Sequence, residues 1–70
     1  MPTPAEELAL KWWKENTCLR GGHTRGSYMH VRDYVDIALW AVEGGEPTEE
    51  EAVRILTPIA QRYLDEKERA

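Results

Sequence analysis

Three side chains that could act as nucleophile, base or metal ligand lie in the first half of the chain: Cys18, His23 and His30. A cysteine thiolate is a nucleophile and a soft metal ligand, and a neutral imidazole is a base or a zinc ligand. The C-x4-H-x6-H spacing matches no common zinc motif, and a fourth ligand would have to come from Asp33 or elsewhere. We therefore expect no bound metal, with Cys18 a small buried thiol near a helix end and both histidines exposed.

The same cysteine and histidines could form a nucleophile–base pair. The sequence supplies neither a third group that would orient the base nor an evident oxyanion hole. An enzyme of 70 residues would also need to place its substrate pocket at an interface between copies. We therefore predict that the protein is not an enzyme and uses no cofactor.

Residues 20–27 form the most unusual segment, with three of the five glycines, Arg20, Arg25, a histidine and two hydroxyl side chains. Free backbone N–H groups at the start of the following helix, together with the two arginines, could hold a phosphate or a carboxylate. The Gly21-x4-Gly26 spacing is near that of a phosphate-binding loop, but the lysine and the preceding strand are missing. The alternative is a polar connection whose glycines permit a chain reversal, and both interpretations remain open.

The three tryptophans suggest a binding surface. Trp12 and Trp13 are neighbours, about 100° apart around a helix, so both cannot face the same core. Trp40 lies off the main apolar face of its helix in the same way. Tryptophan is enriched in interface hot spots, although a core wrapped around helices with wide apolar faces would also account for the pattern. The residues predicted to contact a partner are Trp12, Trp13, Arg20, His23, Arg25, Tyr28 and Trp40.

Charge is unevenly distributed along the chain, whose net charge is -4. Residues 8–32 contain five basic residues and one acid, whereas residues 33–70 contain ten acids and four basic residues. The basic block and its aromatic side chains could bind nucleic-acid phosphates and stack on bases. The acidic remainder would repel a polyanion, and the two blocks could instead neutralise each other within the fold or across a dimer.

Helix start and stop signals bound three segments that have helical apolar spacing. A capping box with proline at the first helical position stands at residues 3–6, and a second capping box begins at Thr48. Ser27 is the expected N-cap of the middle segment, which Gly44 ends because glycine adopts the left-handed conformation without a Cβ penalty. The predicted helices cover residues 3–17, 27–43 and 48–66.

Pro58 interrupts the third segment, since proline removes a backbone donor and crowds the carbonyl four residues earlier. Apolar spacing continues across it, which favours a kink or short break within one rod. Alternatively, the helix stops near Leu56 and Thr57 caps a fourth helix. The charged tail from about residue 65 is expected to fray. No stretch alternates with a period of two, so we predict an all-α domain over residues 1–70, a small bundle of three helices with a possible fourth.

Composition bounds the setting in which the protein works. One cysteine cannot close an intramolecular disulfide, which favours a reducing, cytoplasmic compartment. The longest apolar run, residues 37–42, is far shorter than the roughly 20 residues of a membrane span. The acidic first turn is unlike a secretory signal. A chain of this length buries only about 60% of its surface on folding, so self-association or a partner would add stability.

These observations favour a binding protein. We hypothesise a non-enzymatic protein–protein interaction module, a regulator, adaptor or inhibitor that occupies a surface of a larger protein, and we expect it to be a homodimer. The alternative is a nucleic-acid or anion-binding module that uses residues 20–27 and the basic first helix.

Overall fold

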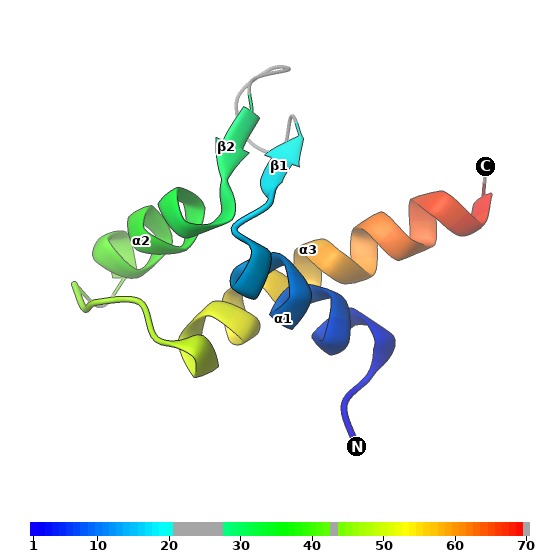
Figure 1. Ribbon diagram of the computed structural model, residues 1–70, viewed down its shortest axis with the longest axis horizontal. Helices are drawn as coiled ribbons and strands as arrows, with labels where there is room; N and C mark the ends of the chain where they lie inside the picture. Colours follow the sequence, from blue (N-terminus) through cyan, green and yellow to red (C-terminus); the bar gives the residue numbers. More distant parts are fainter. Residues whose placement is uncertain (21–27, 43, 70) are drawn as a thin grey trace.

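The computed structural model describes residues 1–20, 28–42 and 44–69. Figure 1 shows α1 lying across α3, the two strands side by side next to that crossing, and α2 leading away from it. The expectation of a mainly helical chain is confirmed, but the expectation that it contains no strands is wrong. The elements in chain order are α1 (Pro4–Glu15), β1 (Cys18–Arg20), β2 (Tyr28–His30), α2 (Val31–Val42) and α3 (Glu49–Arg69).

The two-stranded sheet is the main departure from the predicted fold. β2 occupies the first residues of the helix expected over 27–43, so α2 begins only at Val31, and the proposed N-cap Ser27 lies outside the described residues. Strands of three residues are too short for an alternation of period two to be recognised in the sequence. The strands are antiparallel and pair Cys18 with His30, Leu19 with Met29, and Arg20 with Tyr28.

The capping box predicted for the first helix is present in α1. The Thr3 hydroxyl accepts a hydrogen bond from the Glu6 N–H at 3.2 Å, and the Glu6 carboxylate accepts one from the Thr3 N–H at 3.0 Å. Pro4, at the first helical position, has no N–H that would need a partner. The helix ends at Glu15 because Asn16 adopts the left-handed conformation, with φ 52° and ψ 43°.

The third helix continues through Pro58, so no fourth helix forms within the described residues. Pro58 is exposed, and the Thr57 hydroxyl donates to the Val53 carbonyl at 2.5 Å. At the start of the helix, the Thr48 hydroxyl accepts from the Glu51 N–H at 3.2 Å, while the Glu51 carboxylate contacts Arg54. The helix extends to Arg69, so the charged tail expected to fray is an exposed helical extension.

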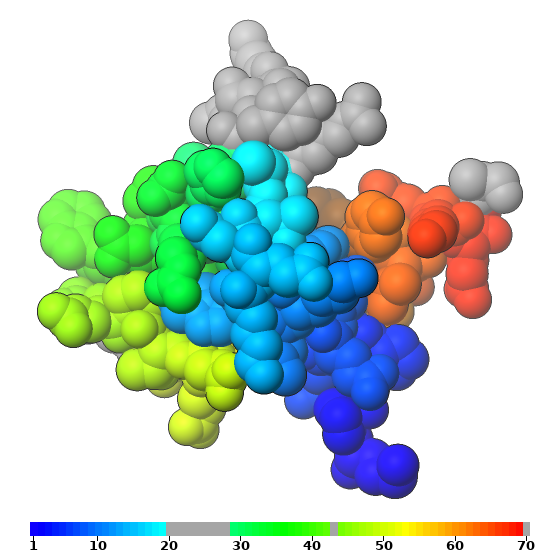
Figure 2. All heavy atoms as spheres, in the orientation of Figure 1, coloured from blue at the N-terminus to red at the C-terminus, as the bar shows by residue number. Residues whose placement is uncertain are grey.

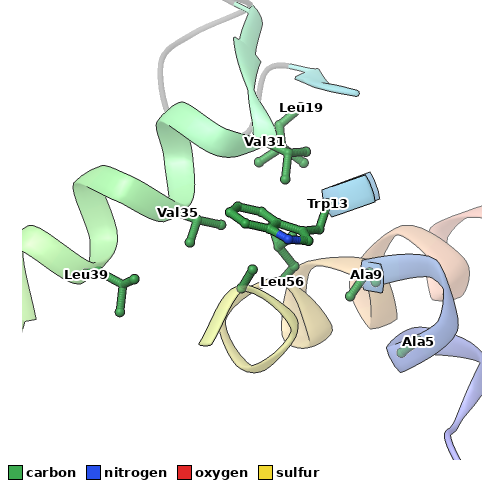
Figure 3. Packing of buried hydrophobic residues seen from close by; sticks show 10 residues of the cluster. Ala5, Ala9, Trp13, Leu19, Val31, Val35, Leu39 and Leu56 are labelled. Atoms are coloured by element: carbon green, nitrogen blue, oxygen red, sulfur yellow. The ribbon is translucent and has the colours of Figure 1, made fainter. Parts of the chain in front are cut away.

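The core lies where the three helices and β1 meet. α1 and α3 share the most extensive contact, and the alanines on both allow their backbones to approach closely. α2 contributes a single buried stripe in which every fourth residue points inward. Figure 3 shows the Trp13 ring lying among side chains of this stripe and Leu56. The buried residues are Ala5, Ala9, Trp13, Leu19, Val31, Val35, Leu39, Ala52, Leu56 and Ala60.

The predicted stop at the end of α2 is confirmed. Gly44 has a φ of +67°, and its N–H donates to the Leu39 carbonyl at 2.7 Å. A left-handed residue that returns a hydrogen bond to the last turn satisfies a carbonyl that would otherwise lack a partner.

Replacing Gly44 with alanine is expected to lower the free energy of unfolding by about 1 kcal/mol, because a Cβ is disfavoured at positive φ. Gly45→Ala is the matched control, since a Cβ at either position would have no atom within 4 Å and only Gly44 has a positive φ. Both changes remove the same freedom from the unfolded chain. Denaturant unfolding measures the difference, and equal stability of the two variants would contradict a left-handed Gly44.

Candidate functional site

Trp13, which we expected to contact a partner, is part of the core. Its side chain is only 7% exposed, and the Arg32 guanidinium lies over its ring, 4.5 Å from the centroid. A cation over the face of an indole is attracted by the ring quadrupole. In this fold the ring extends from α1 to the α2 stripe and Leu56 of α3, so little of it is accessible to a partner (Figure 3).

Trp12 is partly buried and has an aromatic neighbour in its own chain. Its ring meets that of Tyr63 edge to face, with the centroids 5.8 Å apart and the planes at 77°. The Lys67 ammonium lies 6.0 Å from the Tyr63 centroid. Trp12 therefore packs against α3 of its own chain, as in the alternative of a core wrapped around helices with wide apolar faces.

Trp40 differs from the other two tryptophans because it is 77% exposed. Ile37, one helical turn earlier, is 55% exposed, and the two side chains are neighbours on the same side of α2. The buried stripe of α2 uses Val31 and Val35 and turns this side away from the core. An apolar side of α2 outside the core could be predicted from the sequence, because this segment has more apolar residues than a single buried stripe can hold.

Carboxylates border this apolar pair. Asp36 precedes Trp40 by four residues and Asp33 precedes Ile37 by four, so each acid is adjacent to one apolar side chain on the helix surface. Both acids are exposed. We call Asp33, Asp36, Ile37 and Trp40 the α2 outer face.

Cys18 and His30 are brought together by the sheet, which pairs them directly across the two strands. The Cys18 Sγ lies 3.7 Å from His30 Nδ1 and 3.9 Å from His30 Nε2. Cys18 is exposed, so the expectation of a buried thiol is wrong, whereas the expectation of an exposed His30 is confirmed. Sequence spacing could not reveal this pair because the contact depends on the register of the sheet.

Asn16 positions this pair and the start of α2. Its carbonyl lies 3.1 Å from His30 Nδ1, and its side-chain oxygen accepts from the Arg32 N–H at 3.4 Å. The Val31 N–H donates to the Thr17 carbonyl at 3.0 Å. The Asn16 backbone carbonyl thus orients the His30 imidazole. No side chain that could orient it was found in the sequence, and a backbone group cannot be recognised from residue types.

A thiol beside an oriented imidazole can undergo acid–base chemistry or bind a metal ion. Asp33, considered as a further ligand, does not join the pair, because the part of the chain that the structure describes holds no group of three or more potential metal ligands. Two surface depressions near the end of α3 are lined by Pro4 and by α3 residues, and neither Cys18 nor His30 lines them.

Four of the predicted contact residues receive no side-chain description. His23 and Arg25 lie outside the described residues. Arg20 and Tyr28 are register partners in the sheet, where only their backbone is described. Anion binding by residues 20–27 therefore stays a prediction.

The outer side of α1 is not a purely basic surface. Lys11 and Lys14 are exposed there, but Glu7 and Glu15 are exposed on the same side of the helix. One acid stands on either side of the two lysines in the sequence, so α1 presents no long basic strip to a polyanion.

Among residues 1–20, 28–42 and 44–69, no helix is long and apolar enough to cross a membrane.

Comparison of the chain with protein-family models, with curated proteins and with solved structures gives no match.

Trp13→Ala is expected to unfold the protein or to lower its stability by about 3–5 kcal/mol, because it empties the centre of the core. Trp40→Ala is the matched control and should change stability by no more than about 0.5 kcal/mol, since its ring is exposed. Thermal unfolding followed by circular dichroism measures both variants. A larger loss for Trp40→Ala than for Trp13→Ala would contradict the core described here.

Burial raises the pKa of the Tyr34 phenol on α2. Because the folded-state pKa lies above the unfolded value of about 10, the stabilisation is present below that pH and is lost as the pH rises through the folded-state pKa. Tyr34→Phe should therefore lose stability less steeply than the wild type above about pH 10. Parallel declines in urea titrations across this range would contradict the prediction.

Proposed function

We propose that the chain is a non-enzymatic protein-interaction module that acts as a regulator, adaptor or inhibitor by placing the α2 outer face on a larger protein. The observation that carries this proposal is Trp40, which is 77% exposed beside a half-exposed Ile37. An exposed indole next to an aliphatic side chain has the composition of an interface hot spot.

The borders of the α2 outer face indicate the chemistry of the partner. Asp33 and Asp36 flank the apolar pair and are both exposed. An apolar groove rimmed by lysine or arginine side chains complements this arrangement, as in the recognition of an amphipathic helix by a groove. Rim charges of this kind orient the encounter and make the association rate sensitive to salt.

The homodimer expected from the sequence remains a second proposal, and of the three tryptophans only Trp40 still supports it. Trp12 and Trp13 contact other parts of their own chain, which leaves Trp40 as the exposed member of the three tryptophans. The α2 outer face is acidic at its borders, so two copies would bring like charges together if they used this face symmetrically. A foreign partner therefore suits this face better than a second copy.

Site-specific photo-crosslinking in cells tests the proposal. A photoreactive residue in place of Ile37 should capture one discrete protein, and the same residue in place of the exposed Arg62 on α3 is the matched control. With the captured protein purified, Trp40→Ala should raise Kd by at least about 30-fold, or about 2 kcal/mol.

The charged border is tested with the same purified pair. Asp33→Asn with Asp36→Asn should slow association and flatten its dependence on salt, whereas Arg62→Ala should leave Kd unchanged. Equal crosslinking from positions 37 and 62, or full affinity of the Trp40 variant, would contradict the proposed surface. Steep weakening of binding to nucleic acid with added salt would instead favour the alternative module.

A further inference from the structure

The end of α2 exposes apolar side chains on two sides of the helix. Val42 follows Leu39 by three residues and Val35 by seven, so it continues the stripe that is buried earlier in the helix. Val42 is nevertheless as exposed as Trp40, so the stripe extends beyond the core. Figure 1 shows α2 ending away from the crossing of α1 and α3. An occupant that covers both sides of this helix end must therefore be concave.

Acidic residues surround this apolar helix end in the sequence. Residues 33–53 contain seven acids and no lysine, arginine or histidine. Glu51 contacts Arg54. Glu46 is four residues beyond Val42, which limits the distance between their Cα atoms to about 14 Å. Concentrated negative charge therefore borders the exposed apolar surface. The acids that are exposed among the described residues of this segment are Asp33, Asp36, Glu46, Glu49 and Glu50.

This negative charge selects among the occupants of the helix end. A second copy would bring its own carboxylates to the contact, and a nucleic acid or an anionic lipid surface would bring phosphates, so each would be repelled. A concave basic surface is attracted instead. Proteins that bind single-stranded nucleic acid have such a surface, a cationic groove in which aromatic side chains stack on the bases.

Trp40 and its acidic neighbours present the groups that this kind of groove recognises. A nucleotide offers a planar aromatic ring for stacking and a phosphate for the basic side chains of the groove. The exposed indole of Trp40 is likewise planar and aromatic, and Asp36, four residues earlier, is adjacent to it on the helix surface. The indole thus offers the stacking plane of a base, and the carboxylates offer the charge of the phosphates.

We propose that the α2 outer face, extended by Val42, occupies the groove of a protein that binds single-stranded nucleic acid, with Trp40 in the position of a base and the exposed carboxylates in the positions of phosphates. The chain and the nucleic acid then exclude each other from the groove, so the chain inhibits that protein. The inference rests on the proposed function, because it names the partner of the same surface.

Displacement of an oligonucleotide tests the proposal, with the protein crosslinked from position 37 purified as the partner. The partner should bind a fluorescent single strand of about 20 nucleotides, and the full chain should displace it completely. Trp40→Phe keeps a stacking plane and should act within about threefold of the wild type, whereas Trp40→Leu should be at least about tenfold weaker. Glu46→Gln with Glu49→Gln should weaken displacement most at low salt. Arg62→Ala, the matched control, should displace the strand as the wild type does.

Three results would each overturn the proposal: a partner that binds no single-stranded oligonucleotide, a ternary complex of chain, partner and oligonucleotide, or equal displacement by the phenylalanine and leucine variants. If Trp40→Ala still weakens the protein complex while the oligonucleotide stays bound, the interaction module stands and only this inference fails. Absence of a discrete crosslink from position 37 would overturn both.

Discussion

The left-handed turn at Asn16 is the constraint on which the arrangement of the other elements depends. It ends α1, and the two oxygens of this residue then face the start of α2 and the His30 ring. Asparagine suits the position because it tolerates positive φ better than most residues and carries a side-chain acceptor. One residue thus sets where the first helix stops, where the second begins and how the imidazole lies beside the thiol.

This turn also determines how the aromatic side chains are divided between core and surface. Once α2 is attached through Val31 and Val35, the ring of Trp13 fills the space between α2 and α3 (Figure 3). Trp40 then lies on the opposite side of the same helix, where its side chain is 77% exposed. Figure 2 shows α2 at the edge of the molecule. The orientation of α2 therefore both buries Val31 and Val35 in the core and leaves Trp40 on the surface.

Local signals in the sequence predicted much of the fold, and contacts between distant residues were what the sequence could not predict. Helix ends could be predicted because they depend on hydrogen-bond partners three to five residues away in the sequence, as at Thr3, Thr48 and Gly44. The sheet depends on Cys18 meeting His30 across strands of only three residues, a length that carries no periodic signal. The adjacent positions of Trp12 and Trp13 predicted that their side chains point in different directions. The contact between Trp12 and Tyr63 could not be predicted, because it depends on where α3 lies. Trp40 was identifiable because it lies off its helix's apolar stripe.

The narrow attachment of α2 has a consequence for how the molecule opens. α1 and α3 bury a long alanine-lined contact, whereas α2 is held by one stripe of side chains and by the bonds at its two ends. Regions with few buried contacts open locally at a lower free energy than the rest of a protein. The amide hydrogens of α2 should therefore exchange with solvent faster than those in the middle of α3, in a motion that leaves the α1–α3 pair intact. The helix that carries the exposed tryptophan can adjust to a partner without the whole chain melting.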